Sequence, residues 1–188
     1  KTYGDIHDYA KDFINFAADD DVNGPVYFLR AMLDDAWDRP LIPQDVARAW
    51  LNYAREGLGM FWWGGYGVST EHTAYLNLKH GIPAPQSGSI EQNGQIMAEQ
   101  IGGQIFIDTW GFINGNPHRA ADYGEAAASV SHDGNGVYGA RFICAAIAQA
   151  FLTSDVHEIL HAALQEIPAV CTYRDVVEAV IRFHKAHP

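Results

Sequence analysis

The stretch that decides the fold runs from residue 128 to residue 151 and reads ASVSHDGNGVYGARFICAAIAQAF. It starts in an alanine-rich segment, passes through Asp133-Gly134-Asn135-Gly136, and continues as a run of small and apolar residues. Glycine and asparagine tolerate the backbone conformations of tight turns, whereas alanine has the highest helix propensity. We therefore predict two helices, over residues 118–130 and 135–152, that are joined by a tight turn and packed closely.

Helical periodicity continues in both directions from this pair. The first of the further predicted helices begins at Pro25, and the second runs from Pro43 to Gly57. Three more cover residues 70–80, 95–110 and 155–167. The last begins at Thr172, which forms a capping box with Asp175. Their predicted buried faces include Val26, Leu29 and Leu33 in the first and Val46, Trp50 and Ala54 in the second. Alternating strand patterns are not found, so the sequence predicts an all-α fold in a single domain over residues 1–188.

The composition is that of a folded globular chain, since 48% of its 188 residues are hydrophobic. Its net charge of −11 argues against non-specific binding to nucleic acid or to an anionic membrane. The longest nearly apolar run, FICAAIAQAFL, is too short to cross a bilayer. Cys144 and Cys171 have apolar neighbours, and we expect buried free thiols in a cytoplasmic protein.

The segment HEILH, residues 157–161, has the H-E-x-x-H pattern of zinc peptidases. On a helical wheel, His157, Glu158 and His161 fall opposite an apolar face that contains Leu160 and Leu164. A zinc site would bury both imidazoles in a cleft and add a third ligand. We therefore predict a solvated helix face here and keep a zinc peptidase as a minor alternative.

Three consecutive carboxylates, Asp19, Asp20 and Asp21, directly precede Gly24-Pro25. Adjacent negative charges repel one another unless water screens them or a cation neutralises them, and Mg²⁺ prefers oxygen ligands. The same carboxylates could instead complement the dipole of a solvated helix N-terminus. The residues alone leave both interpretations open.

Two further segments have glycines where a ligand could approach the backbone. After His132, the helix that starts at Asn135 and Gly136 offers N–H groups that can bind phosphate, although an ordinary turn with a hydrogen-bonded histidine explains the segment as well. Gly102-Gly103 allows close helix packing or the close approach of a ligand.

Together, ADDDVNG (residues 18–24), EQIGGQIFIDTWGFINGNP (residues 99–117) and the stretch over residues 128–151 resemble the ADP-ribosylglycohydrolase family. The resemblance implies a compact orthogonal multi-helix bundle and a hydrolase that cleaves ADP-ribosyl linkages with two Mg²⁺ or Mn²⁺ ions. It implies an ADP-ribosylated substrate or an ADP-ribose-like small molecule as partner. The implied metal ligands are Asp19, Asp20 and Asp21, with Asp20 and Asp21 also catalytic. The implied substrate-binding residues are His132, Gly102, Gly103, Asn135 and Gly136.

The sequence departs from the family pattern in three places. The family's Gly-Asp-Ala-x-Gly motif is not found before Asp19, its late Asp-x-Asp-Thr/Ser motif is absent, and Phe106 stands where an arginine is expected. We therefore expect the chain to correspond to the middle part of a longer glycohydrolase domain. A non-catalytic ADP-ribose-binding or structural helical protein on the same scaffold is the alternative. The sequence does not indicate an oligomeric state.

Overall fold

The computed structural model describes residues 20–59 and 61–187, without the side chains of Asp20 and Asp21. Within these ranges the chain is helical and contains no strand, which confirms the all-α prediction. The helices are α1 (Asp20–Asp35), α2 (Pro43–Tyr53), α3 (Thr70–Lys79), the short 3₁₀ helix η1 (Gln86–Gly88), α4 (Ile90–Asn93), α5 (Gln95–Ala98), α6 (Gly102–Ile105), α7 (Asp108–Ile113), α8 (Pro117–Ala128), α9 (Asn135–Ala150), α10 (Val156–Gln165) and α11 (Thr172–Ala186).

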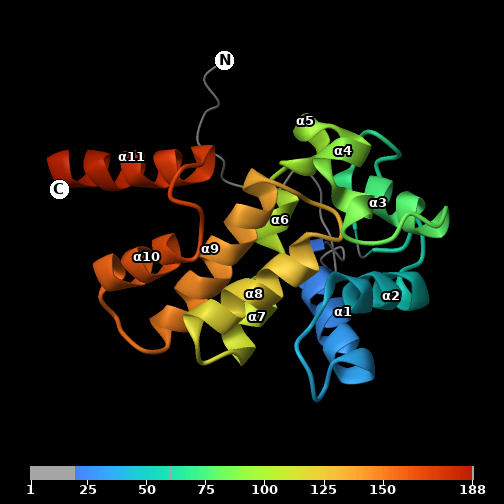
Figure 1. Ribbon diagram of the computed structural model, residues 1–188, viewed down its shortest axis with the longest axis horizontal. Coiled ribbons are helices and arrows are strands. Elements are labelled where there is room, and N and C mark those ends of the chain that lie inside the picture. The colour runs from blue at the N-terminus through green and yellow to red at the C-terminus, as the bar shows by residue number, and fades with distance from the viewer. Residues whose placement is uncertain (1–19, 60, 188) are drawn as a thin grey trace, which may run out of the picture.

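Helix α9 runs through the middle of the compact multi-helix bundle (Figure 1). It packs against α8, α7, α6 and α10, while α1 and α2 pack against each other. Small residues bring α9 close to its neighbours, since a Cβ added to Gly124 of α8 would lie 2.6 Å from Sγ of Cys144. One added to Gly111 of α7 would lie 2.5 Å from Cβ of Ile147. The predicted close packing of the small-residue helix is therefore confirmed.

The second and third predicted helices begin where expected, at Pro43 and Thr70, but α2 ends at Tyr53 rather than at Gly57. In α2, the side chains of Val46 and Trp50 are fully buried, as is Ala54 directly after the helix. Helix α3 ends just before Gly81, whose φ of +87° favours glycine over other residues. In both helices the apolar periodicity matches the packing, whereas the helix-ending glycine matches the observed boundary only in α3.

The prediction for the first helix was wrong in its start and in its buried face. Helix α1 begins at Asp20, so Pro25 lies inside it. The side chains of Val26 and Leu33 are exposed, and the opposite face is buried through Phe28 and Ala31. Phe28 packs between two aromatic rings of the core, at centroid distances of 5.6 Å from Phe106 and 6.2 Å from Trp110. These long-range aromatic contacts, rather than the local spacing of aliphatic residues, set the orientation of α1.

The predicted helix over residues 95–110 is also wrong, because this segment folds as the three short helices α5, α6 and α7. Gly94, at φ +81°, separates α4 from α5, and further breaks follow Ala98 and Ile105. The last helix begins at Thr172 as predicted, but its cap differs. The side chain of Cys171, not Thr172, caps α11 by accepting a hydrogen bond from the Arg174 N–H.

Both cysteines are free thiols, as predicted, but only Cys144 is buried; Cys171 is half-buried. Burial raises the pKa of the Cys144 thiol well above its usual range, so this group stays protonated. Among the helices described, none is long and apolar enough to cross a membrane.

Candidate functional site

A fully buried histidine lies at the centre of the candidate site. His132 follows the end of α8, and its N–H donates to the carbonyl of Ala128 at 2.8 Å. The ring atom Nδ1 lies 2.8 Å from the hydroxyl of Ser131, which is also buried. Among the described residues, Nε2 has no hydrogen-bond partner, which is rare for a buried polar atom. Burial lowers the pKa of His132 to about 3, so the ring is neutral at physiological pH.

Three of the predicted glycines form the wall around this imidazole. A Cβ on Gly102 would lie 3.2 Å from Cε1 of His132, and one on Gly103 would lie 3.1 Å from Cγ. A Cβ on Gly136 would lie 3.1 Å from Cβ of the same residue. The structure therefore brings Gly102, Gly103, Gly136 and His132 together, although α6 and the start of α9 are distant in sequence.

A buried carboxylate that the sequence analysis missed also faces this histidine. Glu71, in the first turn of α3, is 5% exposed, and its Oε1 lies 3.9 Å from Nε2 of His132. Its Oε2 accepts a hydrogen bond from the hydroxyl of Ser69 at 3.2 Å. The 3.9 Å separation exceeds hydrogen-bond length, so the two groups face each other without bonding. An acidic residue in a first helical turn is common, and the sequence held no signal that this one is buried.

The start of α9 binds a carboxylate of the protein itself. The backbone N–H and the side-chain amide of Asn135 both donate to Oε1 of Glu99, each at 2.7 Å. Burial acts to raise the pKa of Glu99, but the hydrogen bonds from Asn135 and Gln95 outweigh it and lower the pKa. The side-chain oxygen of Asn135 also accepts a hydrogen bond from the N–H of Tyr173 at 2.9 Å, so both ends of its amide are engaged within the protein. An anion at this helix start would have to displace Glu99.

The predicted acidic cluster lies at the edge of what the structure describes. Asp19 falls outside the described residues, and Asp20 and Asp21 begin α1 with side chains that are not described. Gly24, one turn further along α1, packs on Phe106, with 3.4 Å from an added Cβ to Cβ of Phe106. The Phe106 ring lies 6.0 Å from that of His132. Helix α1 is thus linked to His132 through Phe106, which is fully buried where the family resemblance leads to an arginine.

The HEILH segment forms a solvent-exposed face of α10, as predicted. His157, Glu158 and His161 are all exposed, whereas Ala163 and Leu164 on the other side of the helix are buried. Within residues 20–59 and 61–187, no group of three His, Cys, Asp or Glu side chains is arranged to hold a metal ion. The burial expected for a zinc-peptidase helix is therefore absent from this one.

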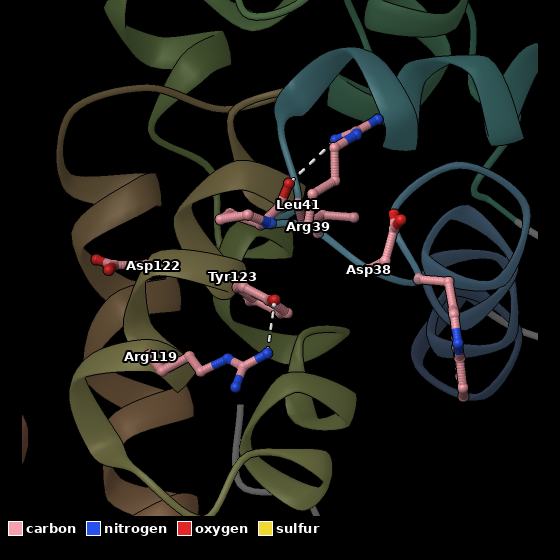
Figure 2. A pocket seen from close by; sticks show the side chains of 8 residues that line it. Asp38, Arg39, Leu41, Arg119, Asp122 and Tyr123 are labelled. Atoms are coloured by element: carbon pink, nitrogen blue, oxygen red, sulfur yellow. Dashed lines mark hydrogen bonds between the residues drawn. The ribbon is translucent and has the colours of Figure 1, made fainter.

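A hollow of about 440 Å³ lies elsewhere, between the start of α8 and the loop that follows α1 (Figure 2). Its two arginines make internal contacts. Arg119 donates to the hydroxyl of Tyr123 at 3.1 Å, and Arg39 forms two hydrogen bonds to the buried carboxylate of Asp45. None of the predicted site residues described by the structure lines this hollow. We therefore assign it no part in the site.

The buried imidazole predicts a specific dependence of stability on pH. An unfolded histidine binds a proton below about pH 6.5, whereas folded His132 stays neutral down to about pH 3. The unfolded state therefore binds more protons in this window, and the free energy of unfolding falls as the pH falls, by at most about 1.4 kcal/mol per pH unit from this group. Urea unfolding between about pH 6 and pH 4 should show a shallower slope for His132→Gln than for wild type. The exposed control His161→Gln should keep the wild-type slope; equal slopes for all three proteins would contradict the assignment.

Comparison with known proteins gives a family match over nearly the whole chain. The family model described as ADP-ribosylglycohydrolase matches residues 3–188, which include the acidic stretch, the Gly102-Gly103 pair and His132. No curated protein and no solved structure gives a significant match. The matched residues span every segment on which the resemblance rested. The chain belongs to the ADP-ribosylglycohydrolase family.

Proposed function

We propose that this protein is a metal-dependent hydrolase that cleaves an N- or O-glycosidic linkage between ADP-ribose and an acceptor. The observation that carries the proposal is the family match over residues 3–188, which extends across both the acidic stretch and the His132 segment. Enzymes of this family act as glycohydrolases, so an ADP-ribosylated compound is the substrate class that fits.

The proposal assigns the metal to the acidic cluster. The described residues alone contain no group of three His, Cys, Asp or Glu side chains that could hold an ion, so the ligands would include Asp19, Asp20 and Asp21. Carboxylate oxygens suit Mg²⁺ or Mn²⁺, and two ions would act in the proposed reaction. When bound, such ions supply Lewis-acid polarisation and an activated water. Asp20 and Asp21 are the proposed catalytic carboxylates, since a carboxylate can act as general base.

The proposed binding region for ADP-ribose lies around the glycine wall. The proposal assigns Gly102, Gly103 and Gly136 to this region because they surround His132. Protein atoms lie within 2.7 Å of an added Cβ at each of these glycines, so a ligand would have to contact the outer side of this wall. Because His132 is neutral and fully buried, we assign it a positioning role rather than that of a general acid. Asn135 would contribute its amide after Glu99 is displaced.

One observation favours a second candidate, a non-catalytic ADP-ribose-binding protein. Phe106 stands where the family resemblance leads to an arginine, and it is buried among aromatic rings instead of presenting a charge. A protein of this kind would bind ADP-ribose equally well with and without a divalent ion.

The test is the release of ADP-ribose from ADP-ribosylated arginine and ADP-ribosylated serine peptides, with Mg²⁺, with Mn²⁺ and after chelation. We expect release of ADP-ribose that chelation abolishes and either ion restores, and a rise in the unfolding temperature when Mn²⁺ is added alone. Turnover that persists after chelation would contradict metal dependence. Binding of ADP-ribose without any release would favour the second candidate.

A further inference from the structure

Helix α11 is attached to the rest of the molecule by its first turn and by Val177 and Ile181, which are half-buried against a core cluster that includes Leu164 of α10. The Tyr173 ring packs on Phe142 with centroids 5.6 Å apart, and the Arg174 guanidinium donates to the carbonyls of Pro168 and Ile167 at 2.9 and 3.2 Å. Only the C-terminal end of α11 extends past α10 (Figure 1). None of its residues, Thr172–Ala186, is buried. An amphipathic helix of this length normally gains its stability from a covered apolar face.

Two adjoining hollows lie along α11, whose apolar face is only partly covered by the rest of the protein. The first has a volume of about 540 Å³ and is lined mainly by apolar side chains, among them Phe142, Val177 and Val180. The second has a volume of about 450 Å³ and lies between α10 and α11. Leu160 and Ile181 line both hollows, so the two adjoin at these side chains, and we call them together the α10–α11 groove.

The two ends of the α10–α11 groove differ in charge. Arg182 and Lys185 line the end near α10, together with His157 and His161. The one carboxylate there, on Glu178, is ion-paired to Arg174 and Arg182 at 3.3 and 3.6 Å. Among the described residues, no carboxylate pairs with Lys185. In a chain with a net charge of −11, this end is an unusual concentration of cationic and titratable groups.

The opposite end of the groove carries a negative group. Glu99 and the amide of Asn135 line the first hollow where it meets the start of α9. An anionic ligand would therefore place its charged group near Lys185 and its apolar part along Ile181 and Val180. The polarity of the groove fixes the orientation of its occupant.

We propose that the α10–α11 groove binds one long-chain aliphatic carboxylate, with the carboxylate at Lys185 and Arg182 and the chain along Leu160, Ile181 and Val180. Each hollow has the volume of a small-molecule site, apolar with a few polar groups at one end. A second copy of the chain fits less well, because two molecules that each carry a charge of −11 repel one another. In this proposal His157 and His161 of the HEILH segment lie at the edge of the hollow, beside the bound carboxylate.

The test is calorimetric titration of the folded protein with decanoate, compared with hexanoate and with decanol. We expect one site for decanoate, with binding roughly tenfold or more tighter than for hexanoate because additional methylenes are partly buried. Decanol, which lacks the charge, should bind about fivefold to tenfold more weakly than decanoate.

Single substitutions on exposed positions of α11 locate the site. Lys185→Gln should weaken decanoate binding about fivefold, whereas Glu178→Gln, which removes the competing carboxylate, should strengthen it about threefold. Val180→Asp should weaken it about tenfold or more. Lys79→Gln, which removes an exposed cation from α3, should leave binding unchanged. Far-UV circular dichroism checks that each variant keeps its helix content.

Several results would overturn the proposal. Equal affinity for decanol and decanoate, or equal effects of Lys185→Gln and Lys79→Gln, would show that the ligand does not recognise the cationic end. Absence of binding at millimolar decanoate would reject the site. A dimer in sedimentation velocity that Val180→Asp dissociates would identify a second copy as the occupant instead.

Discussion

Replacing Asp20 with asparagine is expected to lower the rate of ADP-ribose release by about a thousandfold, which corresponds to roughly 4 kcal/mol of lost transition-state stabilisation. Asparagine keeps the size of the side chain and removes its negative charge, so the variant tests the carboxylate itself. Asp20 lies in the first turn of α1, and the first buried residues described in this helix are Gly24 and Phe28, so the helix content should not change. Turnover measured with Mn²⁺, together with far-UV circular dichroism, gives both quantities.

The matched control is Asp38→Asn, which removes an exposed carboxylate from the loop that follows α1. It should retain wild-type turnover. The rise in unfolding temperature on addition of Mn²⁺ should be lost in Asp20→Asn and kept in Asp38→Asn. If Asp20→Asn kept both its turnover and its response to Mn²⁺, this residue would be neither a metal ligand nor a catalytic group.

A second large effect is expected from Gly103→Ala, which should lower the free energy of unfolding by about 3 kcal/mol. The added Cβ would lie 2.5 Å from the carbonyl oxygen of Gly136 and 3.1 Å from Cγ of His132. A backbone carbonyl cannot move away as the end of a flexible side chain can, so α6 and the start of α9 would have to separate. In a chain of this size the loss corresponds to roughly 10 °C in the unfolding temperature.

Gly115→Ala is the control, because an added Cβ there meets no atom within 4 Å and the residue does not have a positive φ. Thermal unfolding of both variants should separate the effect of the contact from that of simply adding a methyl group. A loss of stability no greater for Gly103→Ala than for Gly115→Ala would show that α6 and α9 do not approach as closely as described.

The parts of the fold that the sequence predicted well are those in which local signals and tertiary packing agree. The α8–α9 pair combines alanine-rich helices with a Gly-Asn-Gly turn, and both helices were predicted within a few residues. Trp50 in α2 was placed correctly because the apolar stripe of that helix is regular. In each case the period of the apolar residues alone defines the buried face.

The parts that sequence reasoning missed depend on contacts between residues that are distant in the chain. The face of α1 is set by Phe28 packing against Phe106 and Trp110, which no local pattern reveals. Likewise, Glu71 and Glu99 look like ordinary surface acids until α3 and α5 are brought against His132 and the start of α9. Local spacing gives helices, whereas the neighbours of a buried carboxylate follow only from the assembled bundle.

The order in which the chain folds follows from the α8–α9 pair. Its connection, residues 129–134, is short, so bringing the two helices together costs little loop-closure entropy. This hairpin carries His132 and Gly136 and also packs against α6, α7 and α10. Contacts from Glu71 and Phe28 come from much earlier in the chain and close far longer loops. Low contact order within the hairpin favours its early formation, so we expect His132 and Gly136 to be in place before α6, which carries Gly102 and Gly103, packs against them.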